Sequence, residues 1–182
     1  MKTTRLISTI AFAFALLLSF NAEAQKFSGL DKSPMDASSF PSNYKESNKQ
    51  IKIVYSRPQL KDRDVYDLAK PEKVWRLGAN EAAELQVYTD MKLDGKDVKK
   101  GTYTVYAIPG KEEWTIIIST DLNVWGSYFY DEKNDVARIT VPTTEGDESL
   151  EAFSIAFEES DKGADMHIGW GTVRVAVPFE KK

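Results

Sequence analysis

The sequence predicts an all-β fold, a jelly-roll-like antiparallel β-sandwich of about nine short strands with minimal helix. Apolar residues recur at every second position through most of the chain after residue 50, and turn residues separate the alternating segments. Helical periodicity is almost absent, with one weak helical segment between Lys61 and Lys70. A sandwich is preferred to a barrel because several strands have a polar face, whereas a ligand-filled barrel needs more apolar interior positions.

The strands follow from local patterns. Alternation puts apolar side chains on one face of four segments: Ile51, Ile53 and Tyr55; Leu85 and Val87; Phe153, Ile155 and Phe157; and Val173, Val175, Val177 and Phe179. Segments 102–109 and 113–120 are apolar on both faces and are joined by Pro109 and Gly110, which predicts a central hairpin. Asp94-Gly95 predicts a second hairpin.

The N-terminus predicts export. Lys2 and Arg5 precede an apolar run, and Ala22-Glu23-Ala24 is a small-x-small cleavage pattern. The run has about 13 residues, too few to span a bilayer, which needs roughly 20. We therefore expect a signal peptide over 1–24, a mature chain that begins at Gln25, no membrane insertion, and a periplasmic or secreted location. An extended N-terminal arm over 25–48 and a single β-sandwich domain over 49–182 are expected to follow.

Composition narrows the function classes. Twenty-four basic and 28 acidic residues give a formal net charge of −4, which argues against nucleic acid as a partner. The chain has no cysteine and one histidine, so thiolate chemistry is excluded and a zinc site is disfavoured. We predict no cofactor and no metal. Oxygen-rich segments 131–135 and 145–149 leave bound calcium open, and the oligomeric state is also open.

Candidate catalytic residues are few. His167 is the only histidine, and strand alternation points it away from Met166 and Ile168. It could act as a general base, but no nucleophile signature accompanies it. Glu81 and Glu84 are the alternative, since a glycosidase needs two carboxylates in one cleft.

The segment KVWRLGANEAAEL, residues 73–85, holds the main ligand-binding candidates, because loops on a rigid scaffold are where binding groups usually lie. Trp75 is expected to anchor it, and Gly78 permits a turn that other residues resist. One interpretation is a ligand site that uses Arg57, Arg76, Asn80 and Glu81. The other is an ion-pair clamp, in which Arg57, Arg63 or Arg76 pairs with Glu81 or Glu84.

Aromatic residues offer another binding surface. Trp125 and Tyr128 lie within WGSYFY and are candidate ligand-binding residues, since exported β-sandwiches often stack sugars on exposed rings. The competing interpretation places Trp114, Trp125 and Phe129 in the core and the tyrosines at its edge.

Six motifs in fixed order carry a family resemblance: VYSRP (54–58), VWRLGANEA (74–82), GTYTVYAIPG (101–110), EWTIII (113–118), LNVWG (122–126) and TVRVAVP (172–178). Together they resemble the bacterial domain-of-unknown-function family 2911, over residues 35–179. The resemblance implies an exported protein of the Bacteroidetes type, and the family supplies no reaction or catalytic residues.

The function favoured by the sequence is a ligand-binding or accessory module of the cell envelope that takes a glycan or a small polar ligand. A hydrolase that uses His167 or a carboxylate pair is the alternative. A purely structural or interaction protein is the third hypothesis.

Overall fold

Nine strands and two single-turn helices follow one another along residues 26–182, the part of the chain that the structure, a computed structural model, describes. The strands are β1 (Met35–Phe40), β2 (Ile51–Ser56), β3 (Ala83–Val87), β4 (Met91–Leu93), β5 (Lys96–Val98), β6 (Gly101–Ile108), β7 (Glu113–Ser119), β8 (Asp135–Ser160) and β9 (Gly163–Lys181). The helices are α2 (Val65–Leu68) and η2 (Glu132–Asn134). The all-β prediction is confirmed. The predicted signal peptide over 1–24 and the start at Gln25 lie outside the described residues.

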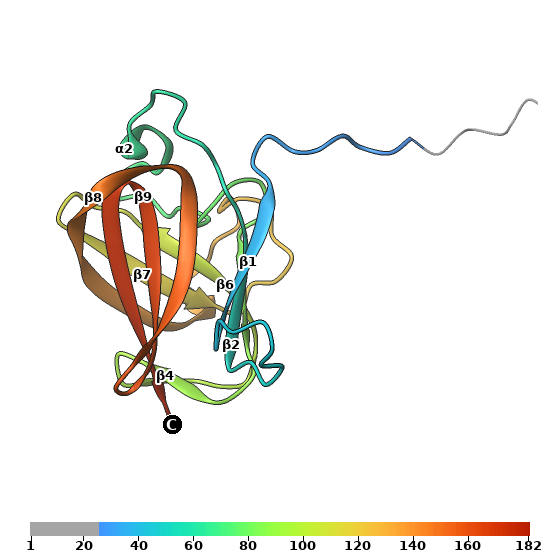
Figure 1. The fold of residues 1–182 in the computed structure, drawn as a ribbon, viewed down its shortest axis with the longest axis vertical. Coiled ribbons are helices and arrows are strands. Elements are labelled where there is room, and N and C mark those ends of the chain that lie inside the picture. Colours follow the sequence, from blue (N-terminus) through green and yellow to red (C-terminus); the bar gives the residue numbers. More distant parts are fainter. Residues whose placement is uncertain (1–25) are drawn as a thin grey trace, which may run out of the picture. The chain divides into compact units, whose positions relative to one another are not determined.

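Hydrogen bonds join all nine strands into one sheet, in the order β1-β2-β3-β6-β7-β8-β9-β4-β5 (Figure 1). Every neighbouring pair in this sheet is antiparallel. The predicted central hairpin is β6 and β7, and the predicted Asp94-Gly95 hairpin is β4 and β5. Asp94 and Gly95 both have positive φ, 49° and 73°, as a two-residue turn of this type requires.

The long strand β8 belongs to two parts of the sheet. Its first residues pair with β7, its later residues pair with β9, and the register shifts between Glu145 and Leu150 and again before Ser154. These irregularities let the strand curve, as Figure 1 shows. The sheet then returns on itself, because Gln59, just after β2, pairs with Ala152 of β8. One curved sheet thus encloses the core. The β-sandwich favoured by the sequence would have enclosed it with two separate sheets.

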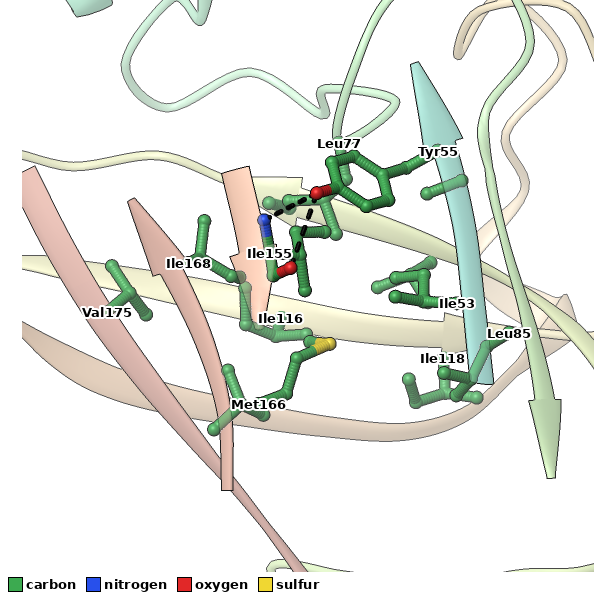
Figure 2. Close-up of a cluster of buried hydrophobic side chains, with 14 of the residues drawn as sticks. Ile53, Tyr55, Leu77, Leu85, Ile116, Ile118, Ile155, Met166, Ile168 and Val175 are labelled. Carbon is green, nitrogen blue, oxygen red and sulfur yellow. Dashed lines mark hydrogen bonds between the residues drawn. The ribbon is translucent and has the colours of Figure 1, made fainter. Parts of the chain in front are cut away.

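Both parts of the sheet bury apolar side chains in one core. The alternating residues of β2, β3, β8 and β9 are buried as predicted, except Val173, which is partly buried against the core. Figure 2 shows Ile53, Leu85, Ile155 and Ile168 in this core. The Tyr55 hydroxyl lies between the two parts (Figure 2). It accepts a hydrogen bond from the Ile155 amide at 2.8 Å and is 3.3 Å from the Ile155 carbonyl oxygen, to which it can donate.

The N-terminal segment contributes to this sheet. Residues 35–40, within the expected arm over 25–48, form the edge strand β1, and Phe40 is buried. The sheet therefore begins at Met35, before the expected domain boundary at residue 49. Met35 itself is exposed and lies on the outer face.

The outer face of the central hairpin is covered by the loop 121–134. Tyr106 and Ile117 point away from the main core, yet both are fully buried. The ring of Tyr130 packs edge-on against Tyr106, with centroids 5.1 Å apart. This cover explains why the segments 102–109 and 113–120 are apolar on both faces.

Candidate functional site

Trp75 anchors the segment 73–85 in the core, as the sequence predicted. Its ring stacks on Trp170 with centroids 5.7 Å apart and planes 9° apart, and it meets Trp114 and Phe153 edge-on. Its backbone exchanges two hydrogen bonds with Ala107 of β6, at 2.7 and 2.8 Å. The start of the segment is therefore held by both packing and strand-like pairing.

A tight turn follows this anchor. Leu77, Gly78 and Asn80 all have positive φ, and Leu77 is fully buried. A Cβ at Gly78 would lie 2.8 Å from the backbone oxygen of Ser56, closer than real contacts allow. Glycine at this position thus permits the positive φ and also lets the turn pack closely against the backbone of β2.

The turn pairs with a second segment, 122–130, about 45 residues further along the chain. The Gly126 amide donates to the Asn80 carbonyl at 2.9 Å, and the Ala82 amide donates to the Val124 carbonyl at 3.0 Å. Glu81 and Trp125 form an antiparallel bridge between these bonds. Two candidate segments that are distant in sequence are thereby joined into one surface.

Polar contacts fix both ends of the loop 121–134. At its start, the Asp121 carboxylate accepts hydrogen bonds from Tyr106 and from Asn134, at 3.2 and 2.7 Å. At its end, Asp135 Oδ2 accepts from Tyr130 at 2.8 Å and from Arg138 Nε at 2.5 Å. In the middle, Ser127 Oγ donates to the Val74 carbonyl at 2.8 Å. The loop is therefore preorganised rather than free.

This polar network was not found by sequence reasoning. Apart from the Val74 carbonyl, its members are scattered between residues 106 and 138, and no local motif marks them. Burial raises the pKa of Tyr130 to about 12, and the hydrogen bond to Asp135 acts in the same direction. Burial and the charge of Asp121 likewise raise the pKa of Tyr106. Both phenols are held in the neutral form by the folded protein.

The fixed loop exposes three aromatic side chains. Trp125 is 56% exposed, Tyr128 76% and Phe129 81%. The interpretation that placed Trp125 and Phe129 in the core is wrong, although its third member, Trp114, is a core residue. Gly126, between Trp125 and Tyr128, has a positive φ of 68°.

A hollow of about 250 Å³ lies on the outer face of β2, β3 and β6, next to Asn123 and Val124 at the start of the same loop. It is lined by Met35, Val54, Glu81, Ala82, Glu84, Thr104, Asn123 and Val124. The two glutamates of the predicted carboxylate pair therefore line one hollow. Glu84 also accepts a hydrogen bond from Gln86 at 3.0 Å. The hollow is smaller than a typical pocket for a drug-sized ligand, so it suits one group of a larger ligand.

The predicted ion-pair clamp is wrong, because its arginines do not pair with Glu81 or Glu84 in the described residues. Arg57 pairs with Asp36 at 2.9 Å and also donates to Ser154 and to the Phe153 carbonyl, so it ties β1 to β8. Arg63 donates to the backbone oxygens of Gln59 and Leu60. Within residues 26–182, no ion pair joins an arginine to Glu81 or Glu84. Backbone pairing holds the turn in place of the expected salt bridge.

Of the remaining candidates, Arg76 lies beside the aromatic loop, residues 122–130, and His167 does not. The Nη1 atom of Arg76 is 3.2 Å from the position that a Gly126 Cβ would take. His167 is on β9, where its side chain is 3.6 Å from Glu158, and it does not line the hollow. Across the described chain, no group of three or more potential ligands gathers to hold a metal ion.

The fold and the site define a β-sheet protein with an exposed aromatic loop beside a small acidic hollow. Residues 36–179 match the family described as "Protein of unknown function (DUF2911)", and the chain belongs to this family. Searches among curated proteins and solved structures found no match. In residues 26–182, no helix is both long and apolar enough to cross a membrane.

Proposed function

We propose that this protein is exported and acts as a ligand-binding module of the cell envelope, which takes a glycan or another small polar ligand. The binding surface consists of the turn 76–82, the aromatic loop 122–130 and the hollow between them. The signal-like pattern over 1–24 supports export.

The exposed aromatics on a fixed loop are the observation that carries this proposal. Trp125, Tyr128 and Phe129 keep most of their surface in water, although large apolar side chains are normally buried. Large exposed aromatic side chains gathered on one loop support an interaction site. Because both loop ends are hydrogen-bonded, a ligand would not have to order the loop on binding.

The chemistry of the surface fits a polyhydroxylated ligand. Flat aromatic rings offer apolar faces for the C–H side of a sugar ring, and Glu81 and Glu84 offer acceptors for its hydroxyl groups. The small hollow would take one sugar unit, while the rest of the chain would lie across the aromatic loop.

Isothermal titration calorimetry of residues 25–182 against a panel of envelope and plant oligosaccharides tests the proposal. Trp125→Ala and Tyr128→Ala should each weaken binding at least tenfold without lowering the melting temperature. Tyr44→Ala is the matched control, because Tyr44 is 87% exposed and lies outside this surface. Equal binding by the aromatic variants and the wild type would contradict the proposal.

A hydrolase is the second candidate, because Glu81 and Glu84 line one hollow. Release of reducing ends from the same oligosaccharides distinguishes it from a binding module. A hydrolase would lose activity in both Glu81→Gln and Glu84→Gln, whereas a binding module would show no activity in the wild type.

A further inference from the structure

Arg76 differs from every other arginine in the described part of the chain. Arg57, Arg63, Arg138 and Arg174 each donate two or more side-chain hydrogen bonds. The side chain of Arg76 makes none with residues 26–182, and its Nε is buried without a partner. No acceptor within residues 26–182 therefore takes the charge of this guanidinium, which leaves its uncovered terminal nitrogens available to a ligand.

The local structure makes room for this guanidinium at the aromatic loop. A Cβ at Gly126 would lie 3.2 Å from Arg76 Nη1 and 2.7 Å from Cε2 of Tyr128. The Arg76 guanidinium and the exposed Tyr128 ring therefore both lie beside Gly126. Of the guanidinium nitrogens, only Nε is both covered and unpartnered. The two terminal nitrogens are the donors that remain open to a ligand.

We infer that Arg76 binds the carboxylate of an acidic sugar, and this inference rests on the proposed function. A planar guanidinium recognises a carboxylate through paired, parallel hydrogen bonds. Trp125 and Tyr128 supply ring faces, and Glu81 and Glu84 supply acceptors for hydroxyl groups. A ligand that matches all three features carries a carboxylate, an apolar ring face and hydroxyls, as a uronic acid does.

The neighbouring glutamates favour a singly charged ligand group. Glu81 and Glu84 line the hollow next to the turn that carries Arg76, although Arg76 itself does not line it. Their negative charges oppose a phosphate, which carries close to two negative charges at neutral pH, more strongly than a carboxylate.

Matched pairs of acidic and neutral oligosaccharides test the inference. The probes are tri-galacturonate, tri-glucuronate and tri-mannuronate, each compared with its methyl ester by calorimetric titration of residues 25–182. For at least one pair, the wild type should bind the acid at least tenfold more tightly than the ester. Arg76→Gln should abolish this preference, and Arg76→Lys should retain only part of it, because lysine keeps the charge but loses the paired geometry.

Lys73→Gln is the control for net charge. Lys73 is an exposed cation three residues from Arg76, and its removal should leave the acid preference intact. If the esters bind as tightly as the acids, or if Arg76→Gln keeps the preference, the inference is wrong while the proposed function stands. If neither acids nor esters bind, and the neutral panel also fails to bind, both are wrong.

Discussion

The Tyr55 hydroxyl lies within hydrogen-bond distance of both backbone groups of Ile155, a residue 100 positions further along the chain. Tyr55→Phe would leave a buried amide and a buried carbonyl without this partner. We expect the free energy of unfolding to fall by about 1–3 kcal/mol, measured by urea denaturation. Tyr128→Phe, at an exposed ring, should leave stability unchanged. An unaltered midpoint for Tyr55→Phe would show that the hydroxyl does not join the two parts of the sheet.

Trp75 and Trp125 lie in the two paired segments but in opposite environments. Trp75 is 8% exposed and stacked on Trp170, so Trp75→Ala should cost about 3–5 kcal/mol of stability. Trp125→Ala removes a largely exposed ring and should change stability by less than about 0.5 kcal/mol. Thermal unfolding of the two variants compares them directly. Similar losses in both would mean that the aromatic loop is packed rather than exposed.

Gly78 and Gly95 separate two effects of adding a methyl group. Both have positive φ, but a Cβ at Gly78 would meet Ser56 O at 2.8 Å, whereas nothing lies within 4 Å of one at Gly95. Gly95→Ala should therefore cost only the backbone strain, about 1–2 kcal/mol. Gly78→Ala should cost more, because the turn must also move away from β2. Equal losses in chemical denaturation would argue against the close approach.

Alkaline pH should weaken the attachment of the aromatic loop. The pKa of Tyr130 is about 12 in the folded protein and its ordinary value is 10. Between these values the unfolded chain loses the phenol proton and the folded chain keeps it, so stability is full below pH 10 and falls as pH rises towards 12. Over this range the loss of stability with pH should be smaller in Tyr130→Phe, although the raised pKa of Tyr106 still contributes, and it should be unchanged in the control Tyr128→Phe. Ultraviolet titration of tyrosinate gives an independent reading.

Export predicts a defined mature N-terminus. Cleavage after Ala24 should leave Gln25 as the first residue, because the small residues Ala22 and Ala24 fit the cleavage pattern. Mass spectrometry of the protein from fractionated cells should find this form outside the cytoplasm. Recovery of the intact chain from Met1 in the cytoplasm would contradict the export prediction.

The sequence by itself determined most of the strands and their buried faces, although it assigned β1 to an extended arm. A strand sends successive side chains to opposite faces, so the apolar alternation at Ile51, Ile53 and Tyr55 identifies the core side without any tertiary information. The hairpin at Asp94-Gly95 was equally predictable, because a two-residue turn needs positive φ at both positions. Trp75 was correctly predicted as an anchor, whereas Trp125, which also stands beside a glycine, is exposed.

Only the tertiary structure decided the candidate site. The exposure of Trp125 depends on a left-handed Gly126 and on bonds from Gly126 and Ser127 to residues about 50 positions earlier, and a local pattern such as WGSYFY contains neither. The acidic partner of each arginine could not be predicted from the sequence either. Charge complementarity allows many pairs, and only the folded geometry selects among them. In the folded structure Arg57 pairs with Asp36, whereas Arg76 has no anionic partner among residues 26–182. Periodicity is a local property of the chain, whereas exposure and charge pairing depend on which distant segments the curved sheet brings together.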